Sequence, residues 1–311
     1  MKTDNRPVSD ASVIRSCILG LAVADAVGVP VEFCRREELD ASPVTGMTGF
    51  GVYPFPAGTW SDDTSMTLCA LDALTKSDFT WDTVMENFGK WYYRSEFTPT
   101  GKMFDIGFTC RFAIEAYFRY GADSTNCGKA DEDCNGNGSL MRILPFVLYA
   151  PYDIGFTEKA SCLTHAHRRS QMACGIYAMV LLRLIETREK DSWRDALREA
   201  EKRYGGEEEW THFTPLLSID TRSRESISGS GYVVDTLEAA LWSLATTGDY
   251  RSCILRAVNL GRDTDTVAAV AGGLAGALYG EKGIPGEWLE TLLRREYLIG
   301  LCEKAAKSWR R

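Results

Sequence analysis

Apolar residues recur along most of this chain at the three- and four-residue spacing of amphipathic helices. The stretch 10–28 is typical, because Ile14, Ile18 and Leu21 fall on one face of a helix. Alternating runs of β-branched residues bounded by turns, which would indicate strands, are nearly absent. Helices are therefore predicted over residues 10–28, 64–76, 81–95, 103–120, 157–187, 191–204, 233–246, 249–260, 266–280 and 286–309.

Two longer stretches, 29–60 and 205–231, lack this periodicity and are predicted to be irregular connections. Long loops of this kind usually carry function or are mobile. The chain has 311 residues, of which 45% are hydrophobic, and this is enough for one substantial core. Because no internal repeat is visible, the simplest interpretation is one all-α domain over residues 1–311.

Composition narrows the classes of partner. The net charge is −8, and no basic stripe is present, so no nucleic-acid partner is expected. The apolar stretch between Cys17 and Phe33 is interrupted by Asp25 and Glu32, which argues against a membrane span. No signal peptide is evident, and the ten cysteines form no CxxC pair. We therefore expect reduced thiols in a cytoplasmic protein with no membrane partner.

Two short acidic segments, far apart in the chain, are its most informative feature. Trp60–Thr64 and Gly261–Thr266 each precede an apolar stretch with helical spacing, so each places carboxylates and a hydroxyl at a helix N-terminus. The same residue types are also ordinary helix caps. If the segments meet, their carboxylates repel unless they are protonated or bound to cations, and hard oxygen donors suit Mg²⁺ or Mn²⁺. The four carboxylates are those of Asp62, Asp63, Asp263 and Asp265.

The helix predicted after Thr266 is unusually rich in alanine and glycine. Each glycine lowers helix propensity by about 1 kcal/mol relative to alanine. Tolerance of Gly272, Gly273 and Gly276 therefore indicates that neighbouring helices approach this backbone closely. The helix is predicted to be central, with the second acidic segment at the mouth of a cleft.

Four further features have both a structural and a functional interpretation. Asp25 lies on the core face of the first helix and needs polar partners there. The turn at 135–139 either presents backbone N–H groups to a phosphate or is an ordinary Asn-Gly turn. His165 is one of only three histidines, too few for a histidine metal site, and hydrogen bonding, stacking or a structural role all remain open for it. The glycines of 228–232 either let a ligand approach the backbone or are simply flexible.

Taken in order, these motifs resemble those of the ADP-ribosylglycohydrolase family, and most of all its dinitrogenase-reductase-activating branch. The resemblance covers nearly the whole chain, and the two acidic motifs are its most specific part. Ala24 stands where the family often has glycine, and the 205–231 stretch has no counterpart that we can place. The matching segments are Ala24–Phe33, Gly58–Met66, Gly136–Arg142, Thr164-His165 and Gly261–Thr266.

The resemblance implies a single-domain orthogonal helical bundle with two divalent cations, Mg²⁺ or Mn²⁺. It implies that the metal ligands are Ser61, Asp62, Asp63, Asp263, Asp265 and Thr266. It implies that ADP-ribose is held by Asn135, Gly136, Asn137, Gly138, Ser139, His165 and Tyr232. The substrate would be an ADP-ribosylated protein or another ADP-ribose conjugate, and the protein would be a monomer or a weak oligomer.

The implied reaction is hydrolysis at C1″ of ADP-ribose. Asp62 or Asp63 would orient the attacking water or accept its proton, and Glu32 would gate the site or protonate the leaving group. An arginine linkage is mildly favoured, while serine, poly-ADP-ribose and O-acetyl-ADP-ribose linkages stay open. Two alternatives remain: an ADP-ribose-binding family member without activity, and a two-metal nucleotide phosphohydrolase.

Overall fold

Helices form nearly all the regular structure in the computed structural model of the chain, which describes residues 6–310. No strand occurs in this range, where extended pairing is limited to isolated bridges such as Gly136 with Tyr232. The α-helices are α1 Ala11–Gly28, α2 Arg36–Ala41, α3 Asp62–Leu74, α4 Trp81–Arg94, α5 Phe108–Tyr120, α6 Leu144–Tyr149, α7 Ile154–Ser161, α8 Arg168–Thr187, α9 Trp193–Tyr204, α10 Val233–Ala245, α11 Tyr250–Val258, α12 Thr264–Tyr279, α13 Gly286–Thr291 and α14 Arg295–Ser308. The predicted all-α class is confirmed.

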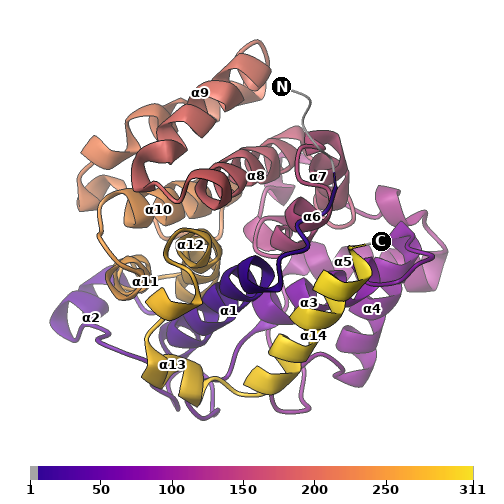
Figure 1. Cartoon of the computed structure of the whole chain (residues 1–311), viewed down its shortest axis with the longest axis horizontal. Helices are drawn as coiled ribbons and strands as arrows, with labels where there is room; N and C mark the ends of the chain where they lie inside the picture. Colours follow the sequence, from indigo (N-terminus) through magenta and orange to yellow (C-terminus); the bar gives the residue numbers. More distant parts are fainter. Residues whose placement is uncertain (1–5, 311) are drawn as a thin grey trace.

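Helices α1 and α12 form the centre of the molecule. They lie side by side, with α8, α10 and α11 around α12 and with α3 and α14 against α1 (Figure 1). A Cβ atom at Gly272 would fall 2.3 Å from the carbonyl oxygen of Gly20, and one at Gly276 would fall 2.1 Å from that of Ser16. The small residues of α12 therefore permit backbone contact with α1, and the predicted central position of α12 is confirmed.

The first helix is hydrophobic enough to resemble a membrane span. Among the described residues, one stretch, Ala11–Val31, has the length and hydropathy of such a span, but most of its most apolar part is buried inside the protein. Its side chains belong to the continuous apolar core that α1 shares with α12 and α3.

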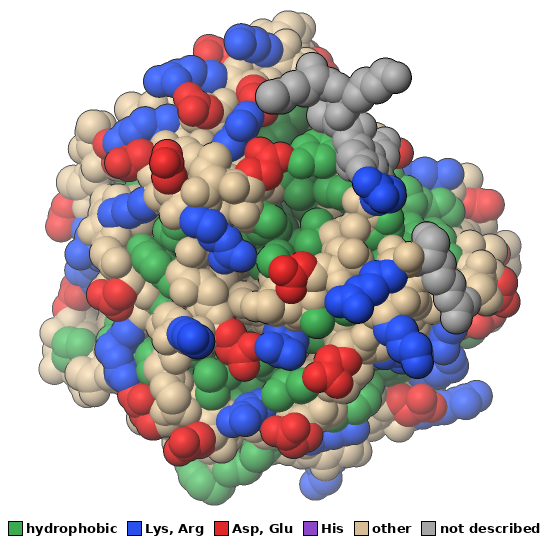
Figure 2. All heavy atoms as spheres, in the orientation of Figure 1, with side chains coloured by type: hydrophobic (Ala, Val, Ile, Leu, Met, Phe, Trp, Pro, Cys, Tyr) green, Lys and Arg blue, Asp and Glu red, His purple; other side chains and the backbone are tan. Residues whose placement is uncertain are grey.

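On the face shown in Figure 2, acidic and basic side chains are interspersed over the surface.

Two of the predicted helices are in fact pairs of helices. The predicted helix 157–187 is divided into α7 and α8 by residues 162–167, where His165 pairs with Lys129 in an isolated bridge. The predicted helix 286–309 is divided into α13 and α14, and Arg294 takes a left-handed conformation with φ 55° at the junction. In both places contacts with distant chain segments override a continuous apolar pattern.

The two stretches predicted to be irregular contain short helices. Residues 29–60 include α2 and a 3-10 turn at Val29–Val31, and residues 205–231 include 3-10 turns over Glu208–Thr221 and Arg224–Ser226. Helix α6 has no counterpart in the prediction. The helix predicted over 103–120 begins only at Phe108, which leaves residues 101–107 as a loop.

Candidate active site

The two acidic segments meet at the N-terminal ends of α3 and α12. The Thr266 hydroxyl donates a 3.2 Å hydrogen bond to Asp63 Oδ2, across 203 residues of sequence. The Ser61 hydroxyl donates to the same oxygen at 3.0 Å. Carboxylate oxygens of Asp25, Asp63 and Asp265 lie within 4.8 Å of one another. The expected convergence of these two distant segments is therefore present in the structure.

Asp25 anchors this arrangement from α1. Its carboxylate accepts the backbone N–H groups of Ser61 at 3.0 Å and Thr64 at 3.1 Å, and the Thr64 hydroxyl at 2.6 Å. The side chain is fully buried. The polar partners expected for a carboxylate on the core face are thus supplied by the first turn of α3, and Asp25 fixes that turn relative to α1.

Six carboxylates, named here the acidic centre, surround the convergence point: Glu32, Asp62, Asp63, Asp105, Asp263 and Asp265. Burial and then the charge of Asp105 raise the pKa of Asp62 well above its ordinary value, and burial with the charge of Glu32 does the same for Asp265. Burial and then Asp105 raise the pKa of Glu32 to about 8. No lysine or arginine is among the described residues that line the pocket. The centre therefore lacks a compensating positive charge.

Three carboxylate oxygens of the acidic centre lack a hydrogen-bond partner within the described part of the chain. Glu32 Oε2, Asp63 Oδ1 and Asp265 Oδ2 are buried and have no hydrogen-bond partner in residues 6–310. An unpaired buried carboxylate oxygen is strongly unfavourable unless a proton or a cation binds it. These hard oxygen donors from three chain segments fit divalent metal ions, and the acidic centre can bind metal.

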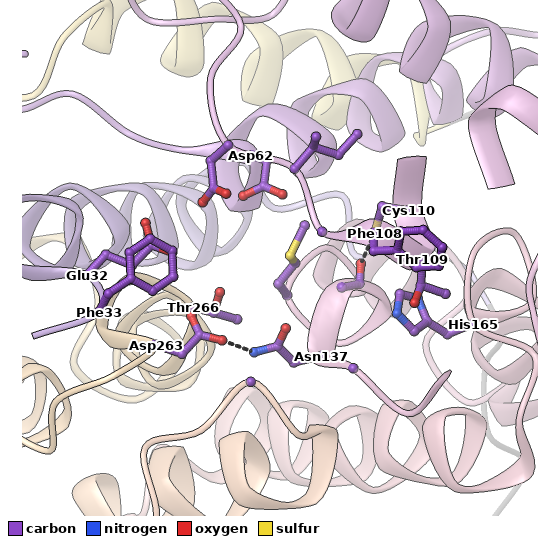
Figure 3. A pocket seen from close by; sticks show the side chains of 17 residues that line it. Glu32, Phe33, Asp62, Phe108, Thr109, Cys110, Asn137, His165, Asp263 and Thr266 are labelled. Carbon is purple, nitrogen blue, oxygen red and sulfur yellow. Dashed lines mark hydrogen bonds between the residues drawn. The ribbon is translucent and has the colours of Figure 1, made fainter. Parts of the chain in front are cut away.

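The six predicted metal ligands all lie at this convergence. Ser61, Asp62, Asp63, Asp265 and Thr266 are buried, while Asp263 is partly exposed. Asp263 Oδ2 accepts a 2.7 Å hydrogen bond from the side-chain amide of Asn137, which is drawn in Figure 3. A Cβ atom at Gly231 would fall 2.9 Å from this same Oδ2, so glycine there leaves room for the Asp263 carboxylate.

A pocket of about 350 Å³ opens beside the acidic centre. Figure 3 shows Glu32 and Phe33 on one side of it and Phe108 and His165 on the opposite side. Of the predicted ADP-ribose-binding residues, Gly136, Asn137, Gly138 and His165 line the pocket. The Gly-rich turn and the histidine are thus brought to the same cavity as the carboxylates.

Three other predicted substrate residues are not part of the pocket lining. The Asn135 carboxamide oxygen accepts the Ser170 hydroxyl, and its carbonyl accepts the Val233 N–H. Ser139 is fully buried and its hydroxyl accepts that of Ser161. Tyr232 precedes α10, next to the pocket residue Gly231. The side chains of Asn135 and Ser139 are used to hold the turn in place. Binding of ADP-ribose by these residues and by Tyr232 stays a prediction.

His165 is a neutral group. It is buried, and its ring Nδ1 lies 2.9 Å from the Thr164 hydroxyl. Burial and the nearby Arg142 lower its pKa to about 3. At physiological pH the ring can therefore donate or accept a hydrogen bond but carries no charge to offset a phosphate.

Asp105 is a site residue that the sequence pattern did not reveal. It lines the pocket, and one of its carboxylate oxygens belongs to a group with oxygens of Glu32 and Asp265 in which all lie within 4.8 Å. Burial and Asp263 raise its pKa to about 6. Its backbone is left-handed, with φ 55°. The available signal was the pair of glycines at 101 and 107, which indicates a loop in place of the predicted helix start.

Strained backbone positions gather around the pocket. Phe33, Asp105 and Arg262 all have positive φ, a conformation that costs about 1–3 kcal/mol for a residue other than glycine. The Phe33 N–H donates to the Arg262 carbonyl at 2.6 Å, and the Arg262 N–H donates to the Cys34 carbonyl at 2.7 Å. This pair of bonds fixes the loop of Glu32 to the second acidic segment.

A second acidic group, named here the paired cluster, consists of Glu132, His167, Arg169 and Glu209. Arg169 donates to Glu132 Oε1 and to Glu209 Oε2, each at 2.7 Å. His167 Nε2 lies 3.1 Å from Glu132 Oε2. The cluster ties the 205–231 stretch to the start of α8, so His167 has a structural place outside the pocket.

Comparisons with known proteins identify the family of the chain. A model of the ADP-ribosylglycohydrolase family matches residues 7–311. ADP-ribosylarginine hydrolase Tri1 of Pseudomonas putida (strain GB-1) is 34% identical over 300 residues, which cover 93% of this chain and 76% of that protein. ADP-ribosyl-dinitrogen reductase glycohydrolase of Rhodospirillum rubrum is 33% identical over 282 residues, 88% of each chain.

A solved structure shares the fold. It is described as an ADP-ribosylglycohydrolase-related protein complex, and it superposes with a TM-score of 0.81 at 31% identity, covering 96% of this chain and 98% of that one. The chain belongs to the ADP-ribosylglycohydrolase family and is a glycosyl-bond hydrolase.

Proposed function

We propose that this ADP-ribosylglycohydrolase releases ADP-ribose from arginine side chains of proteins. Its similarity to an ADP-ribosylarginine hydrolase supports this substrate. The pocket adds a physical reason, because Glu32, Asp62 and Asp105 line it without a lysine or arginine, and such a surface favours a cationic guanidinium. The central observation is that buried, unpaired oxygens of Glu32, Asp63 and Asp265 converge beside this cavity.

The proposed cofactors are two Mg²⁺ or Mn²⁺ ions. The residues that would hold them are Ser61, Asp62, Asp63, Asp263, Asp265 and Thr266. Bound there, such ions supply Lewis-acid activation of water and of ribose hydroxyls. The unpaired oxygens and raised carboxylate pKa values support cation binding at this place.

The remaining chemistry is assigned to side chains of the pocket. Hydrolysis adds a water oxygen to C1″ and breaks the bond from C1″ to the guanidine nitrogen. Asp62 lines the pocket and accepts the water proton. Glu32 also lines the pocket, where burial and the charge of Asp105 raise its pKa, and it donates a proton to the leaving nitrogen. Asp25 contributes by positioning α3, and neutral His165 by hydrogen bonding.

The test combines two variants with one assay. Asp63→Ala and Asp265→Ala should abolish ADP-ribose release and leave thermal unfolding of the metal-free protein almost unchanged. Arginine-linked and serine-linked ADP-ribosyl peptides are incubated with the wild type and each metal, and products are identified by mass. Activity of both variants in chelator would exclude this mechanism. Tight ADP-ribose binding without turnover, or release of phosphate, would point to the two alternatives named above.

We also propose a cytoplasmic location and a monomeric or weakly oligomeric state. All ten cysteines are free thiols and most are buried, which supports a reducing compartment. Sedimentation of the purified protein measures the oligomeric state, and a fluorescent fusion in the source cell tests the location.

A further inference from the structure

Large apolar side chains stand exposed on two sides of the pocket mouth. Single exposed hydrophobic residues are normal on protein surfaces, so their position matters more than their number. We call this set the apolar rim: Phe33, Phe50, Val52, Phe108 and Phe112, with exposed fractions of 65%, 74%, 47%, 73% and 40%.

One side of the rim is built from two segments that are bonded together. The Val52 N–H donates to the Pro30 carbonyl at 2.9 Å, which places residues 50–52 against the loop that leads to Phe33. Phe33 itself lines the pocket. The ring of Tyr53 packs at 5.0 Å from that of Phe104, next to Asp105, so this loop also contacts the segment that enters α5.

The other side of the rim is the start of α5. Phe108 and Phe112 are four residues apart and therefore share one helix face. Phe108 lines the pocket opposite Phe33 (Figure 3). Phe50, Val52 and Phe112 lie outside the pocket lining. A small conjugate held in the cavity has no need of these outer three, whereas a macromolecule that carries the conjugate would cover them.

Backbone strain indicates that this exposure has a use other than folding. Phe33 and Phe50 have φ of 64° and 57°, in the left-handed region that bulky residues avoid. Their side chains are also the more exposed ones on their side of the rim, so burial does not compensate for the strain. Strained residues that are held by their surroundings cluster at functional sites.

We propose that the apolar rim docks the protein that carries the ADP-ribosylated arginine, and that the enzyme prefers arginines flanked by apolar side chains. This inference rests on the proposed function. The rim is continuous with the pocket through Phe33 and Phe108, so apolar neighbours of a modified side chain would meet it when that side chain enters. Contact with such neighbours removes apolar surface from water on both partners.

The experiment compares two ADP-ribosyl-arginine peptides, one flanked by leucines and one by serines. The wild type should show a kcat/KM about tenfold higher for the leucine-flanked peptide. Phe50→Ser/Val52→Ser should reduce this preference to about twofold or less while leaving hydrolysis of free ADP-ribosyl-arginine unchanged. Tyr120→Ser is the matched control, because Tyr120 is 80% exposed at the far end of α5 and should keep the full preference.

A second variant keeps the test valid if the double variant unfolds. Phe50→Gly removes the ring and relieves the positive φ, so it should lose preference without a lower melting temperature. Equal hydrolysis of both peptides by the wild type would overturn the rim proposal and leave the arginine activity intact. Absence of ADP-ribose release from either peptide would instead overturn the proposed function. A Phe50→Ser/Val52→Ser variant that changes only self-association would show that the rim contacts a second copy of the chain.

Discussion

The acidic centre and the paired cluster differ in how their charge is balanced. Both bring carboxylates within metal-binding distance of one another. In the paired cluster, Arg169 bonds both Glu132 and Glu209. In the acidic centre, oxygens of Asp63 and Asp265 are buried and unpaired, and no lysine or arginine is found in the described pocket lining. A cluster of carboxylates alone therefore does not identify a metal site. The distinguishing feature is the lack of a lysine or arginine that neutralises the carboxylates.

The sharpest separation of the two regions comes from replacing one carboxylate with an amide in each. Asp265→Asn should lower ADP-ribose release by about a thousandfold, equivalent to roughly 4 kcal/mol of transition-state stabilisation. The metal-free protein should unfold at the same or a higher temperature, because one buried repelling charge is gone. Glu209→Gln should keep activity within about twofold. Release assays and calorimetry in chelator measure both effects, and equal activity losses in the two variants would abolish the distinction.

The next largest effect is expected from replacing Asp25, which anchors the acidic centre to α1. Asp25→Ala leaves the buried N–H groups of Ser61 and Thr64 without their acceptor, and should lower the free energy of unfolding by about 3 kcal/mol. Activity should fall as well, because α3 no longer holds Asp63 in register with Asp265. Urea denaturation measures the stability change. An unfolding midpoint like that of the wild type would show that α3 is positioned by packing alone.

The paired cluster should respond in stability only. Arg169→Met removes both ion pairs and leaves the half-buried Glu209 without its arginine, which should lower the free energy of unfolding by about 2 kcal/mol. The control Arg198→Met breaks an exposed pair with Asp195 and should cost about 0.5 kcal/mol or less. Thermal unfolding of both variants, measured with and without added metal, tests this prediction. Rescue of Arg169→Met by Mg²⁺ would contradict the assignment of this cluster as purely structural.

The smallest effect is a pH dependence of the metal-free protein. The folded-state pKa is raised to about 8 for Glu32 and to about 6 for Asp105. Proton binding therefore favours the folded state, and this stabilisation is lost as pH rises from about 4, the ordinary carboxyl range, through 8. The melting temperature in chelator should fall by a few degrees, about 2–4 °C, between pH 5.5 and 8.5, and less with Mg²⁺ present. A rise over this range would contradict the raised pKa values.

The helical periodicity predicted most elements well because their apolar faces meet a single core. The expected ranges 81–95 and 233–246 agree with α4 and α10 to within one residue at each end. The division of the predicted helix 157–187 was missed because apolar residues continue through it, while long-range bonds such as that from the Ala166 N–H to the Lys129 carbonyl decide the outcome. Helix α6 was too short to show a period.

In the candidate site, too, residues placed by local motifs were predictable and residues placed by long-range contacts were not. Ser61, Asp62, Asp263 and their neighbours were predictable, because local motifs place them at helix starts. Asp105 was not, because a left-handed backbone and contacts with a distant loop bring it to the pocket, and neither leaves a periodic signal. The hydrogen bonds of the Asn135 and Ser139 side chains were likewise not predictable, because their partners Ser170 and Ser161 lie in other parts of the chain.

The close contact of α1 with α12 limits which parts of the protein can be changed without disturbing the acidic centre. Gly272 lies seven residues beyond Asp265 on the same helix, about 10 Å along its axis. A larger side chain there would wedge the two helices apart and carry Asp25 away from Asp265 without touching either. Libraries that seek a new linkage preference should therefore randomise the 50–55 and 101–107 loops and leave this helix pair as it is.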